Sequence, residues 1–218
     1  MTFKTLSLFT ASAAVLMTGL LAPAQAADAD AAFADKGHDW EGFYAGIGFG
    51  AGGAGVDFDG IGKKGVTDLD STKANIAGIV GYNFMADGWL LGVESSLGSV
   101  GLNKKKAVPG LGDITAKSDW VGTMQLRGGY AFDNVMLYGT AGLALTDLEM
   151  RSSLGGKYDK TVAGLVVGVG GEFALSDNWT ARAEALGYAF SDEGTFNGTK
   201  KKFDFGEGVV RVGITHKF

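Results

Sequence analysis

The chain has 218 residues, a net charge of −5, no cysteine, and 37 glycines against only two prolines. This composition excludes a disulfide scaffold and a thiolate zinc site, and the acidic balance argues against a general nucleic-acid binder, which shows a basic face. A collagen chain would need glycine at every third position, and a disordered chain would have a lower hydrophobic content than the observed 46%. The composition therefore favours an all-β chain with glycine inside its strands.

The N-terminal segment, residues 1–26, has the layout of a secretory signal peptide. Lys4 supplies the positive start, an apolar stretch runs to Leu21, and positions 24–26 give the A-x-A cleavage pattern. The sequence therefore predicts an exported protein whose signal peptide is cleaved. Residues 27–39 are small and polar without periodicity, which predicts a flexible leader.

From position 40 onward, apolar residues alternate with small or polar ones, as in strands with one apolar face. Eight segments show this pattern, near 40–58, 72–84, 88–100, 117–132, 135–149, 160–175, 179–190 and 204–218. Tight turns rich in Asp, Asn and Gly lie at 85–88, 133–134 and 176–178, and longer polar segments at 59–71, 101–116, 150–159 and 191–203. Short turns at one end and long loops at the other predict an eight-stranded antiparallel up-and-down transmembrane β-barrel over residues 40–218, with the turns periplasmic and the loops extracellular.

The two faces of these segments indicate which side meets lipid. In the first segment Phe43, Ile47 and Phe49 lie opposite glycines and Tyr44. An eight-stranded barrel only just holds its inward side chains, so the small face should point inward and the apolar face toward lipid. The orientation of segment 179–190 stays open, because alanine occupies much of both faces. Aromatic residues near the three tight turns predict a girdle at one membrane interface.

Six charged residues fall on inward positions near the turn-side ends of their strands. Isolated charges are costly in a low-dielectric interior, so pairing is expected between Glu94 and Arg127, and between Glu184 and Arg182 or Arg211. This charge layer would be either a selectivity constriction or a salt-bridged plug, and the narrow lumen and balanced charges favour the plug. Its members are Glu94, Arg127, Glu172, Arg182, Glu184 and Arg211.

Three of the predicted loops carry lysine clusters. Because these loops should face the anionic outer leaflet, they predict contact with the phosphates of lipopolysaccharide; solvated loop tips are the alternative. The lysines are Lys63 and Lys64, then Lys104, Lys105 and Lys106, and finally Lys200, Lys201 and Lys202.

The sequence gives little support for catalysis or for a cofactor. The two histidines, His38 and His216, lie far apart, and the strand that carries His216 has no serine or aspartate near it. A hydrolytic triad or a metal site needs such partners, so we expect no enzyme activity and no bound metal or cofactor.

Three motifs resemble one family. WEGFYAG at 40–46 is similar to the W-x-G-F-Y-x-G opening of small alphaproteobacterial outer-membrane proteins, a porin-like family related to the OmpA transmembrane barrel. GWLLGVE at 88–94 resembles the third-strand G-x-E motif of that family, and 210–218 resembles its closing strand. The chain departs from the family where His216 replaces a common aromatic residue. The resemblance implies an envelope protein inserted by the barrel-assembly machinery, with Phe218 as the assembly signal.

The resemblance implies an integral outer-membrane protein that contributes to envelope structure and integrity, and it leaves weak pore activity open. The alternative is a surface receptor or adhesin whose extracellular loops bind haem, lipopolysaccharide or a host molecule. The expected partners are outer-membrane lipids, lipopolysaccharide and, during biogenesis, the barrel-assembly machinery.

Overall fold

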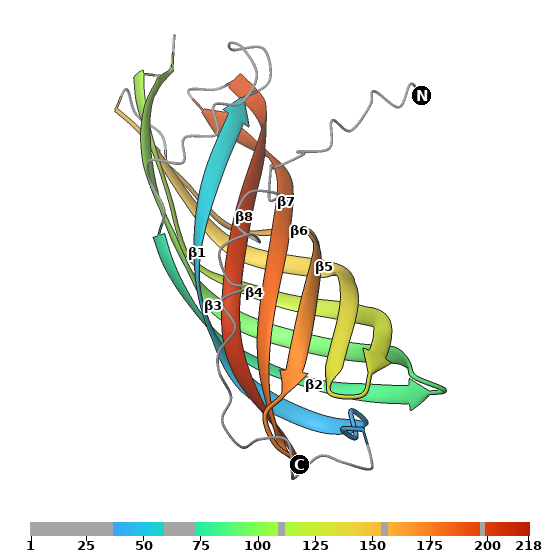
Figure 1. Cartoon of the computed structure of the whole chain (residues 1–218). Helices are drawn as coiled ribbons and strands as arrows, with labels where there is room; N and C mark the ends of the chain where they lie inside the picture. The colour runs from blue at the N-terminus through green and yellow to red at the C-terminus, as the bar shows by residue number, and fades with distance from the viewer. Residues whose placement is uncertain (1–36, 59–72, 109–111, 154–156, 197–198) are drawn as a thin grey trace, which may run out of the picture. The chain divides into compact units, whose positions relative to one another are not determined.

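The computed structural model describes residues 37–58, 73–108, 112–153, 157–196 and 199–218. They form one closed antiparallel barrel, in which neighbouring strands pair in chain order and the last strand pairs with the first (Figure 1). Its strands are β1 (Gly42–Phe58), β2 (Lys73–Ala86), β3 (Trp89–Val108), β4 (Gly112–Phe132), β5 (Val135–Ser152), β6 (Lys157–Ala174), β7 (Trp179–Phe196) and β8 (Thr199–Lys217). The predicted eight-stranded up-and-down barrel is confirmed. Within the described ranges, no helix is long and apolar enough to span a membrane.

The tight turns lie at one end of the barrel, where the chain also ends. Asp87 and Gly88 alone connect β2 to β3, and both have positive φ, 51° and 82°, as a two-residue hairpin turn with right-handed strand twist requires. Asp133, with φ 48°, begins the connection from β4 to β5. At the same end the Phe218 amide donates to the Phe43 carbonyl at 2.9 Å.

The strands continue further than predicted at the other end of the barrel. β3 and β4 contain 20 and 21 residues, and most of the predicted loop 101–116 is a paired hairpin between them. β7 and β8 likewise occupy most of 191–203, whereas 59–71 lies outside the described residues. A membrane crossing needs about 9–11 residues of strand. The boundary prediction was wrong because apolar alternation ends where strands leave the lipid, while backbone pairing continues without it.

The predicted faces of the barrel are confirmed. Large apolar side chains project outward and are exposed along β1 to β6 and β8, including Phe43, Leu137, Val169 and Val210. The structure also settles β7, whose inward face carries charged and large side chains, while Ala183 and Ala189 point outward. The outward face is therefore the one that lipid covers.

Aromatic rings gather near the turn end on the outward face. They form three edge-to-face or tilted series with centroid distances of 4.5 to 5.3 Å, namely Phe43–Tyr82–Phe84, Trp89–Tyr130–Phe132 and Trp179–His216–Phe218. Amphipathic rings favour the headgroup level of a bilayer, so these series mark one edge of the membrane-facing band.

A β-bulge interrupts β4 on the side of the barrel away from the tight turns. The pairing with β5 shifts register between Lys117 and Val121. The Asp147 carboxylate of β5 accepts hydrogen bonds from the backbone amides of Asp119 and Trp120, both at 3.0 Å. One side chain thereby satisfies two amides that the bulge removes from the ladder.

Replacing Asp147 with alanine should destabilise the barrel by about 1–3 kcal/mol, because two backbone donors lose a charged acceptor. Asp147→Asn keeps an acceptor oxygen and should lose less than half as much. Urea unfolding of the reconstituted protein measures both changes. Equal stability of the alanine variant and the parent would show that water replaces the carboxylate without cost.

Candidate functional site

Inward glycines make room for the large polar side chains of the lumen. A Cβ added at Gly81 would collide with the Tyr44 ring of the neighbouring strand. A Cβ added at Gly170 would lie 2.6 Å from the Tyr138 ring and hydroxyl. Each tyrosine therefore lies flat over a glycine, which is how a narrow eight-stranded barrel accommodates rings inside.

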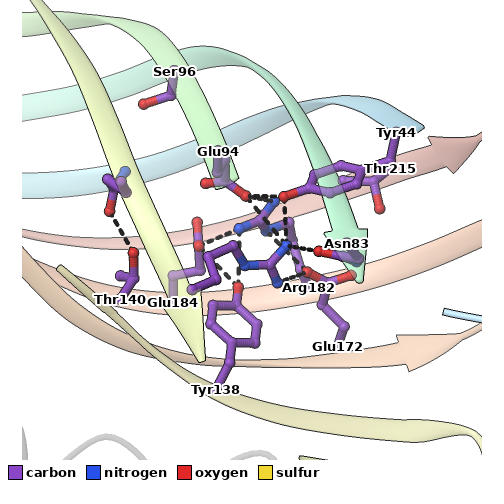
Figure 2. A network of polar contacts seen from close by, with 12 residues as sticks. Tyr44, Asn83, Glu94, Ser96, Tyr138, Thr140, Glu172, Arg182, Glu184 and Thr215 are labelled. Atoms are coloured by element: carbon purple, nitrogen blue, oxygen red, sulfur yellow. Dashed lines mark hydrogen bonds and ion pairs between the residues drawn. The ribbon is translucent and has the colours of Figure 1, made fainter. Parts of the chain in front are cut away.

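The structure brings all six members of the charge layer together inside the lumen through a chain of ion pairs. Figure 2 shows four of them, Glu94, Glu172, Arg182 and Glu184, pointing toward one another. Each of the six residues is 5% exposed or less. They come from β3, β4, β6, β7 and β8, so the layer spans most of the barrel wall. Three carboxylates and three guanidinium groups balance one another, as burial of charge requires.

The pairs expected from neighbouring strands are present with unequal geometry. Arg127 Nη1 lies 3.5 Å from Glu94 Oε2, a long contact. Glu184 pairs with both of the arginines considered for it. Arg211 donates to Glu184 Oε2 through Nε and Nη2 at 3.0 and 2.8 Å, and Arg182 contacts Glu184 Oε1 through Nη2.

Arg127 and Arg182 also make ion pairs that skip strands, and these pairs were not predicted. Arg182 Nη1 on β7 lies 2.9 Å from Glu94 Oε2 on β3. Arg127 Nη2 on β4 lies 2.5 Å from Glu172 Oε1 on β6. Strand adjacency alone cannot predict partners that meet across the lumen. These two pairs join non-neighbouring strands through the interior of the barrel.

Two inward tyrosines, which the sequence did not predict to contact the charge layer, complete the network. The Tyr44 hydroxyl donates to Glu94 at 2.8 Å and accepts from Arg127 at 2.6 Å. The Tyr138 hydroxyl donates to Glu184 at 2.9 Å and accepts from Arg182 at 2.9 Å. In addition, the Arg127 guanidinium lies 3.9 Å from the centre of the Tyr138 ring, a cation–π contact.

An internal repeat in the sequence marks the glutamates that bind these tyrosines, and it could have drawn attention to them. The pattern Trp-x-x-x-x-Glu occurs at 89–94 in β3 and again at 179–184 in β7. Tyr44 precedes its glutamate partner by 50 residues and Tyr138 precedes its own by 46. Both halves of the barrel thus supply a Tyr–Glu pair from the first and third strands of a four-strand unit.

Trp40 lies at the turn end of the lumen, between the barrel mouth and the charge layer. Its side chain is 5% exposed and packs in one cluster with Leu90, Met136, Tyr138 and Ala174. The lumen therefore holds an apolar cluster at the turn end and the ion pairs of the charge layer next to it.

The lysines predicted to lie in loops occupy other positions. Lys104–Lys106 lie on β3 and Lys200–Lys202 on β8, so the loop prediction was wrong for these six, because strand pairing extends beyond the lipid. Lys63 and Lys64 lie outside the described residues. Lys105 is exposed and pairs with Asp113 at 2.9 Å. Contact with lipopolysaccharide stays a prediction, as does the assembly role of Phe218, which is exposed after the end of β8.

The described residues contain no group of three or more His, Asp or Glu side chains placed to hold a metal ion. His216 lies among outward rings, 4.7 Å from Trp179 and 5.0 Å from Phe218 between ring centres. His38 lies at the turn-side mouth against Trp40, with 4.5 Å between ring centres. The two histidines therefore contact aromatic rings at separate places.

Comparison with known proteins places the chain among small barrels. The sequence matches the outer membrane protein beta-barrel domain family over residues 12–217. It is 34% identical to the 31 kDa outer-membrane immunogenic protein of Brucella melitensis, over 82% of this chain and 84% of that protein. It is 31% identical to the 22 kDa outer membrane protein of Rhizobium leguminosarum, over 82% and 78%. The solved structure of OprG from Pseudomonas aeruginosa shares the fold, with a TM-score of 0.52 at 19% identity over 84% and 99% of the chains.

Proposed function

The chain belongs to the outer membrane protein β-barrel family, and on that premise we propose that its barrel is a closed structural component of the outer membrane. The outward apolar side chains anchor it in lipid, and the paired strands that extend beyond the membrane present a surface to the exterior. In this role the barrel contributes to envelope integrity without conducting solutes and without catalysis.

The observation that carries this proposal is the filled lumen. The charge layer occupies the interior with paired side chains, of which Arg127 is 1% exposed. An open channel would need polar side chains lining water, whereas here the arginines and glutamates bind one another across the interior. Self-pairing of this kind supports a structural plug over a selectivity ring.

Planar bilayer recording should therefore show no discrete conductance steps for the folded protein in concentrated potassium chloride. The sample must first show the folded gel mobility, with a shift on boiling, because unfolded chains disturb bilayers. The same protein after boiling serves as the control for non-specific leak. Discrete steps that appear only with the unboiled sample would overturn the closed-barrel proposal.

A further inference from the structure

A short segment before β1, residues 37–41, crosses the turn-side mouth and is here named the strap. The Trp40 indole Nε1 donates to the carbonyl of Asp133, at 3.1 Å. Because Asp133 lies in the turn between β4 and β5, the strap reaches the wall opposite β1 in an eight-stranded barrel. The backbone amide of Met85 donates to the Glu41 carboxylate at 3.2 Å, which fixes the strap to the end of β2 as well.

The strap also contacts β8 through an ion pair. Lys217 Nζ lies 2.6 Å from both the backbone carbonyl and the carboxylate of Asp39. The strap is thus held at three separate points around the mouth. A segment bound at several points around an opening covers it as a lid.

The strap is connected to the charge layer by two routes. The Trp40 carbonyl accepts a hydrogen bond from Asn83 Nδ2 at 3.2 Å, and Asn83 Oδ1 accepts from Arg127 at 3.4 Å. The Trp40 ring packs in the cluster that contains Tyr138, whose hydroxyl binds Arg182. Release of the strap would therefore remove packing and hydrogen-bond support from Arg127 and Arg182.

Titratable groups lie where the strap meets the barrel. Burial, and next the positive charge of Lys217, lower the pKa of His38. The hydrogen bond from Lys217 lowers the pKa of Asp39, whose carboxyl group is largely exposed. The charged groups that face His38 are Lys217, Asp39, Asp177 and Glu172, and the three acids oppose the lowering.

Both groups favour the bound strap at neutral pH, and this contribution to strap binding is lost in acid. The bound strap disfavours the protonated form of His38, so binding weakens as the pH falls below the ordinary histidine pKa of about 6.5 and the released imidazole takes up a proton. Asp39 contributes while it is ionised, and this contribution is lost as the pH falls through its lowered pKa. The two effects have the same sign.

We propose that residues 37–41 form an acid-released strap that seals the turn-side mouth of the barrel at neutral pH, with His38 as its trigger. The strap opens toward the compartment that the turns face, and its release exposes the lower lumen up to the charge layer. This inference goes beyond the closed-barrel role, because it concerns a change of state at one end of the lumen.

Because the chain lacks cysteine, one introduced thiol can report on the seal. Ala174 is 5% exposed beneath the strap, and Ala86 is exposed on the same end of the barrel. Ala174→Cys and Ala86→Cys are labelled separately with a water-soluble maleimide at about pH 7.5 and about pH 5. The ratio of the two rates at each pH cancels the pH dependence of the thiol itself.

The expected ratio of Ala174→Cys to Ala86→Cys labelling is low at neutral pH and rises severalfold in acid, because the released His38 takes up a proton that the bound strap disfavours. Adding His38→Phe keeps a ring against Trp40 and should abolish most of the rise. Adding Trp40→Ala should give fast labelling at both pH values. All samples must keep the folded gel mobility.

Three outcomes would overturn the proposal. Equal rates for the two thiols at neutral pH would mean that no seal exists. A ratio that does not change in acid would mean that the strap is not released by protonation. A full acid response in the His38→Phe background would mean that His38 is not the trigger.

Discussion

Replacing Arg182 with methionine is expected to destabilise the barrel by about 3–5 kcal/mol, the usual cost of removing one partner from a buried ion pair. Arg182 binds Glu94 at 2.9 Å, contacts Glu184 and donates to the Tyr138 hydroxyl at 2.9 Å. Its loss leaves Glu94 without its shortest ion pair in a low-dielectric interior. Urea unfolding in lipid vesicles measures the loss, and the temperature of the gel-mobility shift should fall with it.

Two comparisons isolate the electrostatic part of this effect. Arg151→Met removes an exposed arginine that pairs with Glu149 near the far end of β5, and it should change stability by less than about 0.5 kcal/mol. Combining Arg182→Met with Glu94→Gln removes the stranded charge and should recover part of the loss. If the double variant is no more stable than Arg182→Met, packing rather than charge explains the effect.

Replacing Gly81 with valine is the second change with a large expected effect. An added Cβ would collide with the Tyr44 ring and lie 2.7 Å from the Val93 carbonyl oxygen. The ring cannot move without breaking its hydrogen bonds to Glu94 and Arg127. Overpacking costs about 1–3 kcal/mol by itself, and the lost hydrogen bonds to charged groups add about 1.5–3 kcal/mol each. We expect the folded gel band to be largely lost.

Gly78 provides a matched control on the same strand. It points outward, and a Cβ added there meets no atom within 4 Å. Valine fits strands better than glycine by up to about 1 kcal/mol, so Gly78→Val should fold at least as well as the parent protein. A folded yield for Gly81→Val equal to that of Gly78→Val would show that Tyr44 does not need the space over Gly81.

The strand number, the faces and the turns of the barrel were predictable because each depends on short-range patterns. Period-two alternation gives the faces, and Asp and Gly at 87–88 give a hairpin turn. The ends of the strands away from the tight turns were not predictable in the same way. Outside the lipid no solvent difference separates the two faces, so the residues of 101–108 carry no alternation even though they are paired.

The members of the charge layer were predictable, but their partners were only partly so. Charged residues at inward positions stand out against glycine, which is why Glu94 and Arg211 could be identified from sequence. Arg127 meets Glu172 past one intervening strand, and Arg182 meets Glu94 across the lumen, at positions set by strand stagger and side-chain length. The hydroxyl contacts of the two inward tyrosines were not predicted, because an inward tyrosine resembles ordinary packing until its hydroxyl partners are known.

The length of the strands has a consequence for how this surface can change over time. On the parts of β3 and β4 that extend beyond the apolar alternation, the hairpin is held by backbone hydrogen bonds that do not depend on side-chain identity. We therefore expect substitutions there to leave the strand pairing intact. The region of the molecule that meets the exterior is therefore the region where the sequence can diverge with the least loss of stability.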